Sequence, residues 1–396
     1  MPRSAPGVLL ALLQGGLLLL CLLLPPNGAF AQAVPDQALH QAARINDVEL
    51  ADFALDRGAG LEARDQFGNT PLQVTAMYGS PAVAELLLTR GADPAAATPD
   101  DAWTALHYAA YEGYDRVAGL LIAGGAPIDA REGDYGNTPL HIAARRLKRP
   151  VVAALLAAGA EIDARDRRDG NTALINAAFD PLGSTVVAEL LAAGADPGLA
   201  AGDGTTPLIA AAHAGAEGSL QLLLAAGAAA GAQRHDGWSA LHMAAGAGHT
   251  ALVRDLLAAG VAADLQAATG ATPLGAAIEG AQIDSVIALL EAGADPNLPG
   301  AGGRPPVVLA AAAGQPGALY VLLNRGGDAD AREAETGNTA LMLAANRARL
   351  EEVGLLLQAG ADVHLKAEDG WTALAAAEMI GDSEIAALLR AAGATE

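Results

Sequence analysis

A short sequence pattern recurs every 33 or 34 residues, from about residue 36 to the end of the chain. Thr70, in Asn69-Thr70-Pro71-Leu72, serves as the anchor of one copy. The equivalent anchors are Gln37, Thr70, Thr104, Thr138, Thr172, Thr206, Ser239, Thr272, Pro305, Thr339 and Thr372. A period held this long predicts about eleven tandem repeats, each one small supersecondary unit that is stabilised by stacking on its neighbours.

The residues around each anchor predict a short helix. A Thr can cap a free N–H of the first helical turn, and a following Pro lacks the N–H that would be left unpaired there. Leu stands two residues after the anchor in ten repeats, and Ala stands five after it in ten. A second apolar run follows, such as Val151-Val152 with Leu155-Leu156, whose spacing is typical of one helical face.

Two glycine positions mark the ends of each repeat. A Gly near the end of every repeat, such as Gly159, suits the left-handed residue that closes a helix. A second Gly two residues before most anchors, such as Gly136, is a β-turn signal. Each repeat is therefore predicted to be turn, helix, turn, helix.

Composition agrees with closely packed small helices. Apolar residues make up 52% of the chain but aromatic residues only 3%, so the core must consist mainly of Ala and Leu. Such a core favours close helix packing over a β-sandwich, and the chain is too apolar to be disordered.

The charge balance is acidic, with 23 Lys and Arg against 45 Asp and Glu and a net charge of -22. A nucleic-acid partner needs a basic face on the protein, so this balance argues against one.

Residues 1–31 are predicted to be a cleaved signal peptide. Arg3 begins a short positive region, Val8 to Leu24 is an apolar run, and two A-x-A sites follow, with cleavage expected after Ala31 or alternatively after Ala33. The alternative is an uncleaved membrane anchor, for which the run is short. Cys21 is the only cysteine, so the mature chain would contain none. Abundant Ala and Gly are typical of a GC-rich bacterial genome, which makes the periplasm or secretion the expected destination.

The repeats resemble ankyrin repeats. Thr138-Pro139-Leu140-His141-Ile142-Ala143-Ala144 is similar to the first-helix motif of that family, and Asp65-Gln66-Phe67-Gly68-Asn69-Thr70-Pro71-Leu72 to its turn. The resemblance covers residues 32–396 and implies an all-α, curved solenoid with projecting β-turn fingers and a concave protein-binding face. Two departures are local: Pro305-Pro306 replaces Thr-Pro, and Phe179 to Ser184 contains one inserted residue.

Enzymatic and metal-binding alternatives have weak support. Four histidines stand three residues after an anchor, where the resemblance implies a structural hydrogen-bonding role: His40, His107, His141 and His242. His213, His235 and His249 fall in neighbouring repeats and could meet as metal ligands, but no Cys accompanies them. No nucleophile elbow, metalloprotease or phosphate-loop motif occurs. We therefore predict no catalytic residue, no metal and no cofactor.

Aromatic residues predict where a protein partner binds. Eight of them lie between residues 53 and 135. Those at finger or first-helix positions are the candidates: Phe67, Tyr78, Trp103, Tyr111 and Tyr135. Tyr and Trp are enriched at interface hot spots. Phe53 and Tyr108 have core positions and are assigned to packing. Trp238 and Trp371 share the position of Trp103 far away, which leaves open that such aromatics are isolated surface residues.

A basic cluster follows in the next repeat. Arg145 and Arg146 take first-helix positions, with Lys148 and Arg149 in the turn after them and Arg167 and Arg168 in the next finger. An acidic protein patch or polymer and a merely solvated edge both explain the cluster. The predicted function is an exported, non-enzymatic module that binds a protein, without membrane association after cleavage. A structural scaffold or adhesive surface protein is the alternative, and no oligomeric state is predicted.

Overall fold

The computed structural model describes residues 29–133 and 135–395. These residues form twenty-two α-helices and no β-sheet, which confirms the all-α expectation. Residues 1–28, which carry most of the expected signal peptide, lie outside the described residues. The two expected cleavage sites, after Ala31 and Ala33, fall in the first turns of α2 (Ala29–Ile45).

The chain divides into two compact parts, one of residues up to 177 with 189–195, the other of residues 178–188 with 196–396. The first contains four helix pairs: α2 (Ala29–Ile45) and α3 (Val48–Asp56), α4 (Pro71–Tyr78) and α5 (Pro81–Thr89), α6 (Ala105–Glu112) and α7 (Asp115–Ala123), α8 (Pro139–Arg145) and α9 (Arg149–Ala157). The fifth pair, α10 (Ala173–Ala178) and α11 (Ser184–Ala192), falls at the division.

The second part contains six further pairs and one 3-10 turn, η1 (Ala301–Gly303). The pairs are α12 (Pro207–Ala214) and α13 (Glu217–Ala225), α14 (Ala240–Ala247) and α15 (Thr250–Ala258), α16 (Pro273–Glu279) and α17 (Ile283–Glu291), α18 (Pro306–Ala313) and α19 (Pro316–Asn324), α20 (Ala340–Asn346) and α21 (Leu350–Gln358), α22 (Ala373–Ile380) and α23 (Ser383–Ala391).

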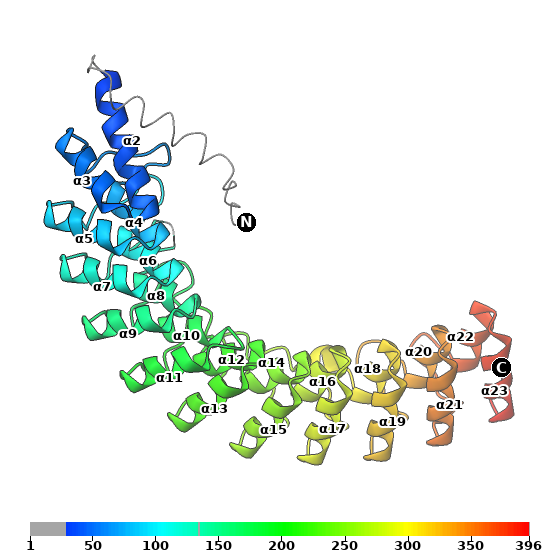
Figure 1. The fold of residues 1–396 in the computed structure, drawn as a ribbon. Coiled ribbons are helices and arrows are strands. Elements are labelled where there is room, and N and C mark those ends of the chain that lie inside the picture. Colours follow the sequence, from blue (N-terminus) through cyan, green and yellow to red (C-terminus); the bar gives the residue numbers. More distant parts are fainter. Residues whose placement is uncertain (1–28, 134, 396) are drawn as a thin grey trace. The chain divides into compact units, whose positions relative to one another are not determined.

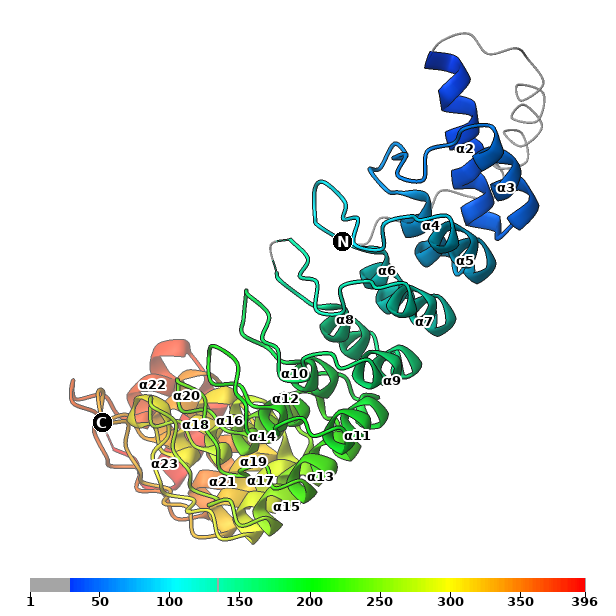
Figure 2. The ribbon, with the colours of Figure 1, turned by 90° about the vertical axis from the view of Figure 1, so that its left-hand side faces the viewer.

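Within each part, the first helix of each pair packs on the first helix of the next pair, and the second helices pack in the same way (Figure 1). The loops that connect successive pairs project beyond the first-helix layer as fingers (Figure 2). Leu72, Leu106 and Leu140, two residues after their anchors, are fully buried between the layers. Stacking the predicted repeats therefore produces one continuous core in each part.

In ten of the eleven repeats the first helix begins at the residue after the anchor, as predicted. Thr70, for example, accepts a hydrogen bond from the Gln73 N–H at 3.3 Å. Pro305 is one of these ten anchors, but it forms no side-chain cap. The closing and finger glycines are left-handed, as Gly159 and Gly136 are with φ of 88° and 64°. The first repeat differs, because α2 continues through its anchor Gln37. Gln is not a preferred N-cap, so nothing at that position begins a new helix.

Hydrogen bonds connect neighbouring fingers. The Arg131 guanidinium donates to the carbonyl oxygens of Gly136, in its own finger, and of Arg165, in the next, at 3.0 and 2.7 Å. Arg64 makes the equivalent pair of bonds two fingers earlier, to Gly68 and Ala97. The fingers of the first part are thereby held in register with one another.

Candidate functional site

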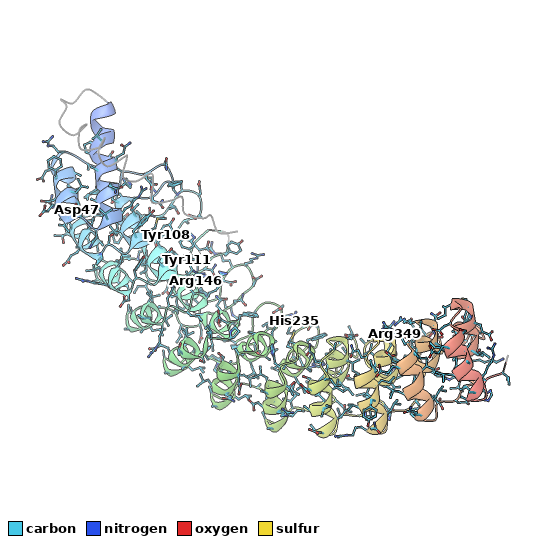
Figure 3. All side chains as sticks on the ribbon, turned by 45° about the vertical axis from the view of Figure 1, so that its right-hand side comes forward. Asp47, Tyr108, Tyr111, Arg146, His235 and Arg349 are labelled. Carbon is cyan, nitrogen blue, oxygen red and sulfur yellow. The ribbon has the colours of Figure 1, made fainter. Side chains whose placement is uncertain are left out.

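Trp103 lies at the centre of a group of aromatic side chains on the finger side of the first part. Its ring centre is 5.0 Å from that of Tyr108 and 5.9 Å from that of Tyr111. The tilted and edge-on orientations are those that aromatic rings prefer. Tyr111, on α6, also contacts Arg146, which follows α8 (Figure 3). We call Trp103, Tyr108, Tyr111 and Arg146 the Trp103 cluster.

The finger that carries Trp103 is tightly constrained. The Trp103 carbonyl oxygen accepts from the Thr98 N–H at 2.9 Å and from the Gln73 side-chain amide at 2.8 Å. Ala102 has a left-handed φ of 55°, where most other fingers have Gly. A left-handed non-Gly residue is strained by about 1–2 kcal/mol. These contacts hold the strained backbone in place and so orient the indole.

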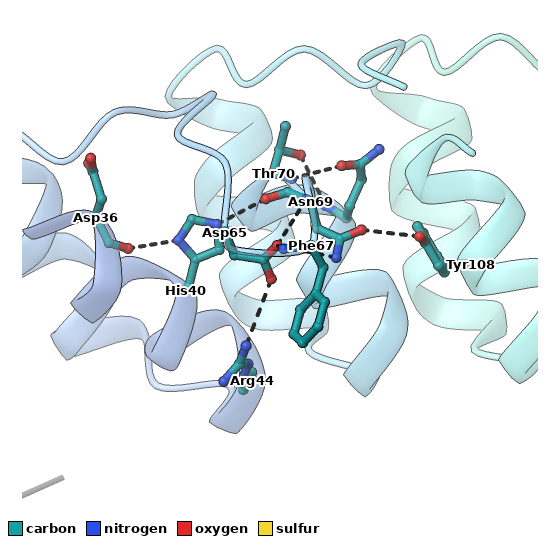
Figure 4. A network of polar contacts seen from close by, with 9 residues as sticks. Asp36, His40, Arg44, Asp65, Phe67, Asn69, Thr70 and Tyr108 are labelled. Carbon is teal, nitrogen blue, oxygen red and sulfur yellow. Dashed lines mark hydrogen bonds and ion pairs between the residues drawn. The ribbon is translucent and has the colours of Figure 1, made fainter. Parts of the chain in front are cut away.

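Tyr108 connects the cluster to the preceding finger. Its hydroxyl donates to the side-chain oxygen of Asn69 at 3.1 Å, and Asn69 in turn donates to Asp65 (Figure 4). Burial, with smaller contributions from the negative charges of Asp101 and Asp65, raises the pKa of the Tyr108 phenol well above its usual range. Tyr108 therefore stays neutral and remains a donor at physiological pH.

Two Tyr–Arg pairs follow the same geometric rule. The Arg146 guanidinium lies 4.3 Å from the Tyr111 ring centre, and that of Arg168 lies 4.8 Å from the Tyr135 ring centre. In each pair the Arg comes from the repeat after the one that carries the Tyr. A guanidinium over a ring is attracted by the electrons of the ring face, and its N–H groups remain available at its edge.

The structure brings together some of the predicted site residues. Trp103, Tyr111 and Arg146 are in one cluster, while Tyr135 and Arg145 are exposed in the neighbouring repeat. Tyr78 is half exposed and lies under the Arg44 guanidinium instead. Phe67 is 62% exposed and contacts no other aromatic ring or cation among the described residues. Trp103 and Tyr111 are partly buried rather than freely exposed.

The assignment of Phe53 to the core is wrong. Its side chain is 41% exposed on α3, with the Arg57 guanidinium 4.8 Å from the ring centre. The side chains that are buried on α3 are the small residues Ala51 and Ala54, so the ring has no place in the core. Tyr108 does pack as predicted, but it is half-buried and belongs to the Trp103 cluster.

The histidines after the anchors have structural roles. The Thr104 N–H donates to Nδ1 of His107 at 3.1 Å, which requires the proton to be on Nε2, and Nε2 donates to the Asn137 carbonyl oxygen at 3.2 Å. Burial lowers the pKa of His107 to about 4. His141 and His242 make the same bonds, and burial lowers their pKa values too. These rings are neutral connectors between adjacent repeats.

The three histidines considered as possible metal ligands are His213, His235 and His249. The His249 ring lies against Gly215. Over residues 29–133 and 135–395, no three His, Cys, Asp or Glu side chains come together in a way that could hold a metal ion. No helix in that same part of the chain is long and apolar enough to span a membrane.

Gln73 is a site residue that the sequence reasoning missed. Its amide oxygen accepts from the Thr70 N–H at 2.7 Å, and its amide nitrogen donates to the carbonyl oxygens of Ala96 and Trp103. A signal was available, because Gln73 stands three residues after its anchor, where other repeats have His.

Comparison with known proteins supports the repeat assignment. A family profile described as ankyrin repeats (3 copies) matches residues 9–98, 39–132, 95–166, 208–299 and 307–395, which together cover most of the chain.

Curated relatives match over short segments. Cyclin-dependent kinase 4 inhibitor B of Mus musculus is 43% identical over 75 residues, which is 19% of this chain and 57% of the relative. The Bos taurus inhibitor is 41% identical over 75 residues, or 19% of this chain and 56% of the relative. Mitochondrial disaggregase of Bos taurus is 42% identical over 59 residues, or 15% of this chain and 9% of the relative. The chain thus spans just over half the length of the inhibitors it matches.

Proposed function

Because the chain belongs to the ankyrin-repeat family, we propose that it is a non-enzymatic module that binds a partner protein on the finger and first-helix face around the Trp103 cluster. Ankyrin repeats are protein–protein interaction modules, and the family is generally non-enzymatic. We choose this face because of the Trp103 cluster. In this cluster, aromatic rings from a finger and a first helix are held in place by Gln73 and Asn69.

Preformed geometry supports this role on energetic grounds. Side chains and loops that are already ordered lose little conformational entropy on association, so more of the contact energy contributes to affinity. Tyr and Trp are also the residues that most often dominate binding energies. The inhibitors among the relatives act on a kinase, by their names.

We also propose that the module acts after export, in the periplasm or outside the cell. The support is the positive region, apolar run and A-x-A sites of residues 1–31. The partner should then be found in the cell-envelope fraction or in the medium.

Site-specific photocrosslinking tests the proposed face. A photoreactive phenylalanine derivative at Tyr111 is expected to crosslink a distinct partner in the native envelope fraction. The matched control is the same derivative at Tyr320, which is 57% exposed on the second helix α19. With the photoreactive residue kept at position 111, Trp103→Ala combined with Tyr135→Ala should abolish capture of the same partner while the helical circular dichroism is retained. Equal recovery of many proteins from both positions would favour a structural scaffold or adhesive protein and contradict the proposed site.

A further inference from the structure

We propose that the basic patch next to the Trp103 cluster binds an acidic segment of the partner protein. The patch consists of Arg145, Arg146, Lys148, Arg167 and Arg168. This inference rests on the proposed protein-binding function and specifies the chemistry of the partner.

Most of these cations have no carboxylate partner among the described residues. The structure has ion pairs at other arginines, among them Arg90 with Asp52 and Arg149 with Glu189. No carboxylate of residues 29–133 or 135–395 lies within ion-pairing distance of Arg145, Arg146, Lys148 or Arg167. Acidic residues outnumber basic ones about two to one in this chain. Adjacent cations that pair with no described carboxylate are therefore the feature that an acidic partner would complement.

Two of the cationic groups are oriented so that they can bind a carboxylate. Arg146 and Arg168 each place the guanidinium plane over a Tyr ring, which leaves the N–H groups at the edge free to bind a carboxylate in the bidentate manner. Arg168 has one weak competitor, since its Nε lies 3.9 Å from the Asp169 carboxylate. The methylene stem of Lys148 packs over Gly113 in the preceding repeat, and this contact holds the stem in place.

Two nearby carboxylates, those of Asp101 and Glu132, already accept hydrogen bonds within their own fingers. Asp101 accepts from the hydroxyl of Thr98 and lies 3.4 Å from the Trp103 N–H. Glu132 is buried and accepts from the backbone and side-chain amides of Asn137 at 3.2 and 2.8 Å. These carboxylates stabilise fingers instead of neutralising the patch. The patch thus offers at least two Arg forks, one from the first-helix layer and one from a finger.

Fluorescence anisotropy with a defined probe tests the inference. The probe is a fluorescein-labelled peptide of about twelve glutamates, compared with the equivalent glutamine peptide and with single-stranded DNA of similar length. We expect the protein to bind the glutamate peptide at about 50 mM salt and to bind it several-fold more weakly at about 300 mM, because salt screens exposed charges. The glutamine peptide should not bind.

A matched pair of charge reversals locates the binding. Arg145→Glu with Arg146→Glu should weaken binding of the glutamate peptide about tenfold or more. The control is Arg116→Glu with Arg254→Glu, which changes the net charge equally but on the second helices α7 and α15. This control should change the affinity less than about twofold. Equal loss in both variants, absence of binding by the parent, or tighter binding of DNA would overturn the inference.

The peptide-binding test and the crosslinking test can fail independently of each other. If crosslinking through position 111 is unchanged by Arg145→Glu with Arg146→Glu, the face binds a partner that is not acidic, and only the present inference fails. If crosslinking at position 111 fails while the glutamate peptide binds at the patch, the proposed site fails instead.

Discussion

The side-chain amide of Gln73 donates to the backbone carbonyl oxygen of Trp103 at 2.8 Å, which connects the first helix of one repeat to the finger of the next. The same side chain caps its own helix by accepting from the Thr70 N–H at 2.7 Å. One residue therefore contributes both to local helix capping and to the position of the Trp103 cluster.

Replacing Gln73 should destabilise this region. Gln73→Ala removes the acceptor of the buried Thr70 N–H, the side-chain donor to the Ala96 carbonyl oxygen, and one of the two donors to the Trp103 carbonyl oxygen. This loss should lower the free energy of unfolding by about 2–4 kcal/mol. Gln73→His should restore much of the loss, because His107 makes the equivalent bonds in the next repeat. Urea unfolding and hydrogen exchange of the Thr98 and Trp103 amides measure the effect. An alanine variant as stable as the parent would show that these bonds contribute nothing.

His107 should make stability depend on pH. Burial lowers its pKa from 6.5 to about 4 in the folded chain, so between these values the unfolded chain binds more protons and stability falls as the pH falls. For this one group the loss from about pH 7.5 to pH 5 should be about 2 kcal/mol.

The His107→Gln variant isolates that contribution, because Gln can cap the helix as Gln73 does but cannot be protonated. Urea unfolding of parent and variant at both pH values gives the difference. His141 and His242 remain in both proteins, so their contributions, which have the same sign, cancel. If both proteins lose the same stability on acidification, His107 is not responsible for the pH dependence.

Leu155 and Leu156 should respond differently to a charge. Leu155 is fully buried between repeats, whereas Leu156, beside it in the sequence, is only partly buried. Leu155→Asp should lower the free energy of unfolding by about 3–5 kcal/mol, because a charge would have to enter the core. Leu156→Asp should lower it by only about 1 kcal/mol. Thermal unfolding of the two variants distinguishes the positions, and equal losses would contradict the burial difference.

At the position nine residues after the anchor, Gly should give a more stable protein than Ala. Ala281 and Ala348 are left-handed there, with φ of 56° and 53°, whereas Gly248 occupies the same position with φ of 79°. Ala281→Gly should raise stability by about 0.5–1 kcal/mol, since the relief of left-handed strain exceeds the added freedom of the unfolded chain. The reciprocal Gly248→Ala should lower it, also because a Cβ would lie 2.1 Å from the Gln282 side chain. Chemical denaturation measures both, and a loss of stability in Ala281→Gly would refute the strain argument.

Export predicts a defined N-terminus. After cleavage at an A-x-A site the mature chain should begin at Gln32 or Val34. N-terminal sequencing of protein from the envelope fraction or the medium measures this directly. Protein that retains Met1 in the membrane fraction would contradict cleavage.

The sequence by itself determined the repeats, their boundaries and their capping. These features depend on interactions within a few residues, such as a Thr hydroxyl with the N–H three residues later or a left-handed Gly that ends a helix, so they recur visibly in most copies. The tertiary structure decided which side chains meet across repeats. Phe53 was assigned to the core but is exposed, and Tyr111 pairs with Arg146 from the next repeat. Burial and pairing depend on residues about 33 positions away, which a pattern within one repeat does not specify.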